Sequence, residues 1–525
     1  QLMEGVEDIP GTALHEGVDW NWETFPEFLD AIEKKDFVMD LGFMIGHGPL
    51  RSYVMGYERC QSQVDASEEE ISKMSELVTE AIESGALGFS TSRTILHRDV
   101  HGVYVPGTEA SSEEMKSLAF AIDKAGEGTL EIVSDWLDKE IEMSWMKEYV
   151  EKSDCGLTVL QTSGDAVKTI LFCEEQFLKG KNVRPQFPGR NVGMMFGLES
   201  SLHPFIGHPS YREIAELPLS ERVKIMSDPA FKEKLLKEKP NFASEIEKSM
   251  NEQGSAKSKE EIQEAASLGQ KLISNYETQF ILGDPPNYEP GKEDSIAALA
   301  ETKGVSELEV IYDEFLKNGG TNLVYACFTP YDNHKLDFVE RAYSLKSSVA
   351  GGSDGGAHCG LICDASMPTT NLSHWARDRE AGKKIPIELI VRKQTKDTAE
   401  TYGLFDRGEI KTGMLADLNI IDFENLNVTH PKMVYDLPMG GRRLIQNSFG
   451  YLATVKSGEV VYESGEATGV LPGKLIRGKQ TCEVKAEKEK IPFVDRTLRL
   501  MSVKAFKLLW NLRKKPAKTT VVSGD

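Results

Sequence analysis

Short apolar segments alternate with capped helices along most of the chain, and this alternation constrains the fold more than any other feature. Two intervening helices carry the start signal of a capping box, at Ser67 with Glu70 and at Ser111 with Glu114. A strand, a polar loop, a capped helix and a glycine in that order are typical of parallel βα units. The sequence therefore predicts an α/β fold, a TIM-type (β/α)8 barrel. Six segments are its predicted strands: 41–47, 86–91, 130–134, 157–161, 323–328 and 348–354.

Changes in pattern divide the chain into three regions. Residues 1–404 are expected to form the barrel, with a helical insertion at about 185–290 that shapes the pocket or its lid. Within the insertion, 219–239 and 258–275 have helical character. Short strands and glycine turns over 405–478 predict a small β-sandwich, and 479–525 form a tail.

Charge and composition narrow the possible partners. The 525 residues include 83 acidic and 61 basic side chains, a net charge of -22 that argues against nucleic-acid binding. No apolar run reaches about 18 residues, so no transmembrane segment is expected. The seven cysteines form no CxxC pair, which predicts a reduced, cytoplasmic protein.

The tail carries a basic amphipathic pattern over 494–515. Such a helix can lie on an anionic surface. The alternative is a helix that docks against an acidic protein surface. The sequence does not determine the oligomeric state.

The strongest local signal for chemistry is the segment GGSDGGAH at 351–358. Asp354 is expected at the carboxyl end of a barrel strand, where it could bind a metal and take a proton from metal-bound water. The alternative is a turn aspartate that caps the next helix. His358 is expected to support the metal site or to make a loop hydrogen bond.

Other candidates follow the first two predicted strands. His47 is expected either to bind metal or polarise a substrate carbonyl, or to be a satisfied structural histidine. Arg51 and Arg93 are candidates for binding a substrate carboxylate. His97 and His101 read as lid or solvent residues.

The strand ends that should supply further metal ligands lack histidine. The third and fourth predicted strands end near Asp135 and Gln161. None of the ten histidines forms an HxH, HxxH or HExxH pair. The sequence as given therefore holds no complete metal site.

Taken together, these residues resemble the amidohydrolase superfamily, in its N-acyl-D-amino-acid deacylase (D-aminoacylase) branch. Each matching motif is weak to moderate alone, and their order and spacing make the resemblance specific. The motifs are MEGVEDIP at 3–10, HGPLRSYVMG at 47–56, GALGFSTSR at 85–93, SDGGAH at 353–358 and GMLADLNIID at 413–422.

The resemblance implies a metal-dependent barrel with a small β-sandwich that hydrolyses a non-peptide amide. In that family an HxH pair, a second-strand ligand, two later histidines and a last-strand aspartate hold the metal, and Asp354 matches the aspartate. The HxH pair and the second-strand ligand have no counterpart here. We therefore expect an N-terminally truncated chain whose first two barrel strands, with most ligands for a divalent metal (zinc is the expected ion), precede residue 1.

The leading functional hypothesis is a hydrolase of a linear C–N bond, with an N-acyl amino acid as its small-molecule substrate. Asp354 would shuttle the proton, His47 would polarise the carbonyl, and Arg51 or Arg93 would hold the carboxylate. Two alternatives remain open: a non-catalytic amidohydrolase-fold protein that acts through partner binding, and a cyclic amidase.

Overall fold

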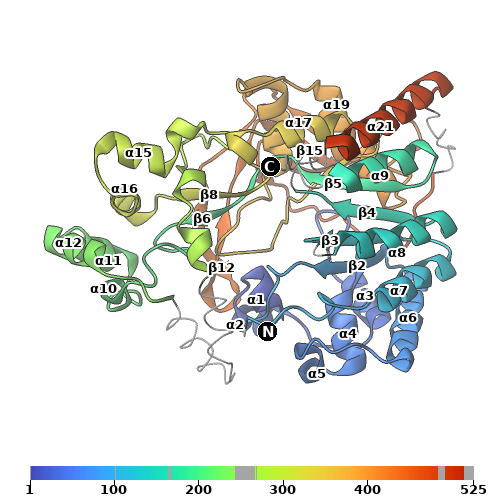
Figure 1. Ribbon diagram of the computed structural model, residues 1–525, viewed down its shortest axis with the longest axis horizontal. Helices are drawn as coiled ribbons and strands as arrows, with labels where there is room; N and C mark the ends of the chain where they lie inside the picture. The colour runs from blue at the N-terminus through green and yellow to red at the C-terminus, as the bar shows by residue number, and fades with distance from the viewer. Residues whose placement is uncertain are drawn as a thin grey trace, which may run out of the picture.

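A six-stranded parallel sheet forms the centre of the protein (Figure 1). The computed structural model describes residues 2–100, 102–136, 138–162, 167–242, 267, 269–482 and 491–513. The strand order is β1-β2-β3-β4-β5-β9, and every neighbouring pair is parallel. The strands are β1 (Ile45–Gly46), β2 (Gly88–Arg93), β3 (Thr129–Ser134), β4 (Gly156–Leu160), β5 (Val183–Pro188) and β9 (Val349–Gly351).

Five of the six predicted strands lie in this sheet, and the prediction for 323–328 was wrong. That segment is β8 (Val324–Thr329), the middle strand of a separate antiparallel sheet between β6 (Val192–Phe196) and β7 (Gln279–Ile281). The first four residues of β8 are all buried. A continuous apolar run of this kind fits a buried strand in either sheet, so the sequence alone could not assign β8 to one of them.

The strand that the sequence did not reveal is β5, at the predicted start of the insertion. Pro185 and Pro188 argue against a central strand, because proline cannot donate a ladder hydrogen bond. All six residues of β5 are nevertheless buried, and Val159 pairs with Pro185 while Pro188 pairs with Gly351. The insertion therefore begins after residue 188.

Amphipathic helices cover one side of the sheet (Figure 1). Helix α6 begins with the predicted capping box, because Ser67 and Glu70 exchange both hydrogen bonds. At α7 only half of the predicted box forms: Ser111 accepts from the Glu114 amide, but the Glu114 carboxylate turns into the interior. These helices are α6 (Glu68–Glu83), α7 (Ser112–Ala125), α8 (Lys139–Lys152) and α9 (Val167–Leu178).

The inserted segment forms a lobe with its own hydrophobic core on the other side of the molecule (Figure 1). The predicted helix over 219–239 is two helices, separated where Asp228 caps the second one. The prediction for 258–275 falls mainly outside the described residues. The lobe contains α10 (Pro209–Arg212), α11 (Leu219–Met226), α12 (Pro229–Lys237), α15 (Ile296–Lys303) and α16 (Glu307–Phe315).

After the last sheet strand the chain turns to short antiparallel strands, as the glycine-rich pattern predicted. They form a four-stranded sheet in the order β10-β15-β16-β17 and the pairs β11-β14 and β12-β13. Their bounds are β10 (Leu418–Ile421), β11 (Asn427–Val428), β12 (Lys432–Leu437), β13 (Gly441–Ile445), β14 (Ser448–Phe449), β15 (Tyr451–Lys456), β16 (Glu459–Glu463) and β17 (Glu466–Ala467).

Shorter helices surround the two ends of the sheet. They are α1 (Leu2–Glu7), α2 (Gly11–Gly17), α3 (Phe25–Glu33), α4 (His47–Met55), α5 (Tyr57–Gln61), α17 (Asp337–Ser344), α18 (Met367–Thr370), the π-helical turn Asn371–Asp378, α19 (Ile387–Gln394) and α20 (Lys396–Thr401). No helix among the described residues is long and apolar enough to cross a bilayer.

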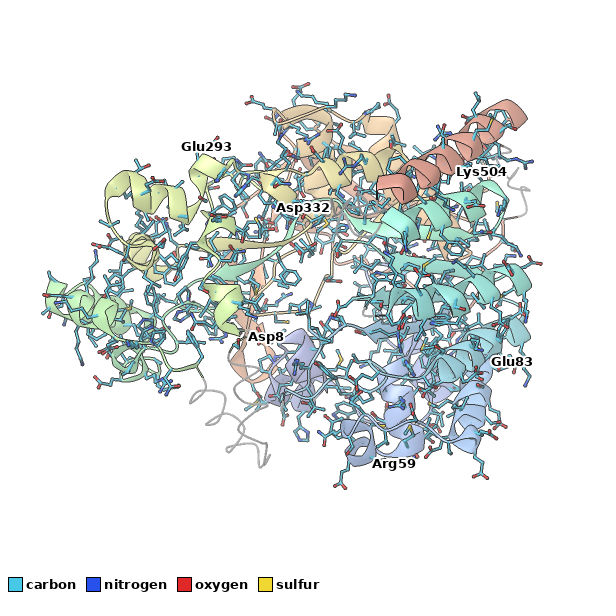
Figure 2. All side chains as sticks on the ribbon, viewed as in Figure 1. Asp8, Arg59, Glu83, Glu293, Asp332 and Lys504 are labelled. Atoms are coloured by element: carbon cyan, nitrogen blue, oxygen red, sulfur yellow. The ribbon has the colours of Figure 1, made fainter. Side chains whose placement is uncertain are left out.

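The basic tail forms α21 (Phe493–Arg513), which lies along α9. Lys507 pairs with Glu175 of α9, and Val503 is buried. Leu498, Met501 and Lys504 face solvent, the last as labelled in Figure 2. One face of the helix thus docks on the protein, while contact of its outer face with an anionic surface or a partner stays a prediction.

Candidate active site

Asp354 lies at the carboxyl end of β9, where the sequence placed it. Two residues separate it from the last strand residue, Gly351, and its side chain is exposed. Its φ of 41° is in the left-handed region, which aspartate tolerates better than most residues. The turn therefore presents the carboxylate to solvent at the end of the sheet where parallel α/β enzymes carry their chemistry.

Helix α1 docks onto the loop that follows Asp354. The Glu7 carbonyl accepts from the Cys359 amide at 3.1 Å, and the Asp8 carboxylate accepts from the Gly360 amide at 3.1 Å. Glu7 Oε2 lies 3.7 Å from His358 Nε2. Burial raises the pKa of Glu7, the charge of His358 opposes this rise, and the charge of Asp354 adds to it. The N-terminal helix thus adds a carboxylate to the same small region; Asp8 is labelled in Figure 2.

His97, on the loop after β2, belongs to this group. Its Nδ1 lies 2.7 Å from Ser92 Oγ. Burial and the charge of His358 lower the pKa of His97, while Asp354 and Asp135 act in the opposite direction. The lowered pKa favours the neutral imidazole of His97 at pH 7. Its side chain is half-buried on this loop, and a role in a lid stays a prediction; His101 lies outside the described residues.

His47 is the first residue of α4 and is buried in a closed polar cluster. Its Nδ1 lies 2.8 Å from Thr91 Oγ1, and its Nε2 lies 2.8 Å from Glu114 Oε1. Arg51 donates to the same carboxylate oxygen at 2.8 Å and to the Val64 carbonyl. Both ring nitrogens of His47 are engaged, so the geometry favours the structural alternative for His47, and substrate contact by Arg51 has no support.

The electrostatics of this cluster agree with a structural role. Burial lowers the pKa of His47, so Arg51 supplies the positive charge that balances Glu114. Burial would raise the pKa of Glu114, but His47 and Arg51 outweigh it and hold that pKa below its usual value. Sequence reasoning missed Glu114 as a buried partner because a glutamate three residues after a helix cap is expected to face solvent.

Arg93 is the last residue of β2, and some of its hydrogen-bond donors have partners within the protein. Its Nε donates to Glu142 at 2.7 Å, and its Nη1 donates to the carbonyls of Gly107 and Ala110. Its Nη2 has no hydrogen-bond partner within the described part of the chain. Of the two predicted carboxylate-binding arginines, Arg93 is the more accessible to a ligand, with 11% of its side chain exposed against 1% for Arg51.

The described residues do not by themselves fit a divalent metal. No three His, Cys, Asp or Glu side chains among them gather closely enough to hold one. Asp135 accepts from the Thr94 hydroxyl and the Ile95 amide, so it anchors the loop after β2. Two buried oxygen atoms, Gln161 Oε1 and Glu7 Oε2, have no hydrogen-bond partner among the described residues. These two atoms alone do not form a metal site.

A second buried ion pair near Asp354 could not be found from the sequence. Arg190, two residues after β5, donates to Asp364 Oδ1 at 2.9 Å and stacks 3.6 Å from the Tyr288 ring centroid. Burial raises the pKa of Asp364 to about 6, against the effect of Arg190, and the charge of Asp354 adds to the rise. The pair joins β5 to the segment after β9 and so fixes the wall of the candidate site.

Comparisons with known proteins show which sequences and folds this chain resembles. The Amidohydrolase family model matches residues 287–462, which include Asp354. An uncharacterised protein of Mycobacterium tuberculosis is 24% identical over 499 residues, covering 89% of this chain and 76% of the relative. The D-aminoacylase of Alcaligenes xylosoxydans xylosoxydans is 25% identical over 416 residues, covering 79% of this chain and 67% of the enzyme.

Two crystal structures of D-aminoacylase show the same fold. One matches with a TM-score of 0.50 at 18% identity, and the other, from work on the binuclear metal center of that enzyme, with a TM-score of 0.51 at 18% identity. Each alignment covers 91% of this chain and 80% of the solved chain. The resemblance inferred from the motifs is thus confirmed: residues 287–462 match the Amidohydrolase family model, and the chain has the fold of the D-aminoacylases.

Proposed function

We propose that this protein is a metal-dependent hydrolase of linear amide C–N bonds, with an N-acyl amino acid as its substrate. One observation supports the proposal: Asp354, within the segment that matches the family model, is exposed beyond the carboxyl end of β9 and interacts electrostatically with Glu7 and His97. Closure of the sheet into a (β/α)8 barrel and a sandwich arrangement of the later strands are parts of the same proposal.

The metal of this proposal is divalent, with zinc as the expected ion, and D-aminoacylase, a protein with a binuclear metal center, has the same fold. Because the described residues do not fit a metal by themselves, the chemistry assigned here belongs to the chain's own side chains. We assign proton transfer to Asp354. Its carboxylate accepts the proton of the attacking water as the new C–O bond forms, and returns it to the nitrogen as the C–N bond breaks.

Neighbouring groups would position the substrate. His97 is neutral, and with Nδ1 held by Ser92 its Nε2 can donate a hydrogen bond to the amide carbonyl oxygen as charge develops there. The free Nη2 of Arg93 can hold the substrate carboxylate. His47 and Arg51 are left out of this assignment because their polar atoms are occupied within the protein.

The test is release of free amine from a panel of N-acetyl-D- and N-acetyl-L-amino acids by the intact protein and by Asp354→Asn. We expect kcat/KM to fall about 10²–10⁴-fold in Asp354→Asn, the usual contribution of a general base. Asp337→Asn, at the start of α17, is the matched control and should keep full activity. Full activity of Asp354→Asn would overturn the assignment of Asp354, and turnover of a hydantoin alone would reassign the substrate to a cyclic amide.

A non-catalytic role has one observation in its favour: within the described residues no three metal donors converge. Metal analysis of the purified protein separates this alternative from the hydrolase. Stoichiometric metal together with amidase activity excludes the non-catalytic role, whereas a metal-free protein that hydrolyses no amide supports it.

A further inference from the structure

A groove of about 1020 Å³ lies along the amino-terminal edge of the parallel sheet. Its floor includes the first residues of β3 and β4, Thr129 and Gly156, and its wall includes Glu400 of α20 and Lys479. Because Asp354 follows the carboxyl end of β9, the groove is at the other end of the strands and is separate from the candidate active site.

Cations without counter-ions line this groove. Lys346, Lys479 and Arg496 contribute to its walls, and none has a carboxylate partner among the described residues. In contrast, Lys181 and Lys396 in the same groove pair with acidic side chains, at 2.9 Å and 2.8 Å. The groove of a chain with a net charge of -22 thus carries three basic side chains without ion pairs in the described part of the chain, and the acidic residues Asp123 and Glu127 line it as well.

Arg184 forms the buried end of the groove. It is 4% exposed, its Nε donates to Asn182 Oδ1 and its Nη2 donates to Glu400 Oε2, both at 3.1 Å. Its Nη1 is buried and has no hydrogen-bond partner within the described structure. A buried donor left unpaired is costly, and an acceptor atom of a ligand in the groove would satisfy it.

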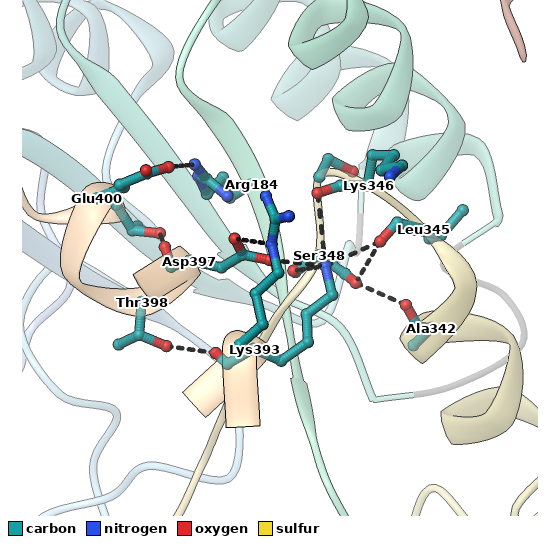
Figure 3. A network of polar contacts seen from close by, with 12 residues as sticks. Arg184, Ala342, Leu345, Lys346, Ser348, Lys393, Asp397, Thr398 and Glu400 are labelled. Carbon is teal, nitrogen blue, oxygen red and sulfur yellow. Dashed lines mark hydrogen bonds and ion pairs between the residues drawn. The ribbon is translucent and has the colours of Figure 1, made fainter. Parts of the chain in front are cut away.

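In the ionic network around Arg184 (Figure 3), the cations Arg184, Arg392 and Lys393 share the carboxylates of Asp397 and Glu400. Lys393 donates to the carbonyls of Leu345 and Ser348 and lies 3.2 Å from Asp397, which also accepts from Arg392. Burial lowers the pKa of Lys393 to about 8, and the charge of Arg184 adds to this effect against Asp397 and Glu174. Two buried cations thus disfavour each other, and an anion bound nearby would stabilise both.

We propose that this groove binds a small polyanion, a molecule that carries phosphate or carboxylate groups on an apolar body. Arg184 Nη1 would donate to one oxyanion group at the buried end, and Lys346 and Lys479 would bind a second at the walls. The aromatic rings of Phe177 and Phe405, which also line the groove, would contact the apolar body. The site is independent of the hydrolytic function proposed above.

Titration calorimetry of the intact protein at low salt, with pyrophosphate, ATP and citrate as probes, tests the proposal. We expect saturable binding of one equivalent of at least one probe, and the probe that binds separates phosphate from carboxylate ligands. The double variant Lys346→Gln/Lys479→Gln should bind at least about tenfold more weakly, because charged hydrogen bonds contribute about 1.5–3 kcal/mol each. The control Lys234→Gln/Lys303→Gln, two exposed lysines of the lobe with the same loss of charge, should bind like the wild type.

Arg184→Lys gives an independent result, since it keeps the charge but loses the planar donors. We expect it to weaken the probe at least about fivefold and to lower the rise in Tm that the probe produces in the wild type. Binding of no probe, or equal weakening in the control pair, would overturn the proposal. If Arg184→Lys does not fold, the lysine pair and its control still decide the outcome.

Discussion

The two ends of the central sheet differ in which polar groups they expose or leave unpaired. At the carboxyl end, Asp354 and Glu7 share a region with the buried Asp364. At the amino end, burial lowers the pKa of Arg184 and of Lys393; Arg392 adds to the effect on Arg184, and Arg184 adds to the effect on Lys393. The carboxyl end thus exposes a carboxylate, whereas the amino end keeps a buried arginine donor, Arg184 Nη1, that has no hydrogen-bond partner among the described residues.

The comparison also shows how a structural ion cluster differs from a functional one. In the cluster of His47, Arg51 and Glu114, four nitrogen atoms of the His47 and Arg51 side chains have protein partners at 2.7–2.8 Å. Near Asp354, by contrast, the charged groups of Glu7 and His358 approach no closer than 3.7 Å. Groups that a substrate must reach keep free hydrogen-bonding capacity, whereas groups that hold the fold together use theirs.

The largest expected effect is on the closed cluster. Glu114→Ala removes the carboxylate shared by His47 and Arg51 and leaves a buried cation without a partner, which costs about 3–5 kcal/mol. Urea denaturation followed by circular dichroism measures this loss. The adjacent Glu113→Ala, with a side chain 78% exposed, should change stability by less than about 0.5 kcal/mol. A loss below about 1 kcal/mol in Glu114→Ala would reopen His47 and Arg51 as substrate-binding residues.

The amino-end network predicts a pH dependence in the alkaline range. The pKa of Lys393 is lowered from 10.5 to about 8 in the folded protein, so the unfolded chain binds more protons between these values. The free energy of unfolding should therefore rise from pH 8 to pH 10.5, by up to about 3 kcal/mol. Denaturation across this range should show a flatter profile for Lys393→Met and an unchanged profile for the exposed control Lys411→Met. The same slope in Lys393→Met and the wild type would show that the network carries no unbalanced charge.

The smallest expected effect concerns Glu7. Its pKa is raised in the fold, so its contribution to stability is present at acidic pH and is lost as pH rises through the folded pKa. Glu7→Gln has no carboxyl group to ionise, so the loss of stability at neutral pH does not occur in this variant. The substitution should therefore raise the free energy of unfolding at pH 7 by less than about 1 kcal/mol, with no gain at pH 4. Thermal unfolding at both pH values, with the exposed Glu16→Gln as control, measures the difference. A destabilised Glu7→Gln would mean that the carboxylate is engaged in a favourable contact at neutral pH.

Local patterns predicted much of the architecture because they act over a few residues. The capping box at Ser67 and the glycine after β9 depend only on neighbouring residues, so they can be recognised in the sequence whatever the fold. The strand β5 could not be predicted in this way, since Pro185 breaks the local rule and only pairing with β4 and β9 makes the segment a strand. The segment of β8 was correctly predicted to be a strand but was assigned to the wrong sheet, because its apolar pattern fits any buried sheet.

The same distinction holds for the candidate site. Asp354 was predictable because a glycine-flanked acid after a strand is a local arrangement. Glu7, Glu114 and the Arg190–Asp364 pair were not, since their partners are far away in the chain and burial alone gives them their role.

By itself, the sequence determined the βα order, the acidic charge of the chain and the position of Asp354 after a strand, because each depends on neighbouring residues or on composition. The tertiary structure alone decided which polar groups are satisfied within the protein. His47 and Arg93 look equally suited to a ligand in the sequence, and only the packing of Glu114 and Glu142 against them shows how many of their hydrogen-bonding atoms remain free.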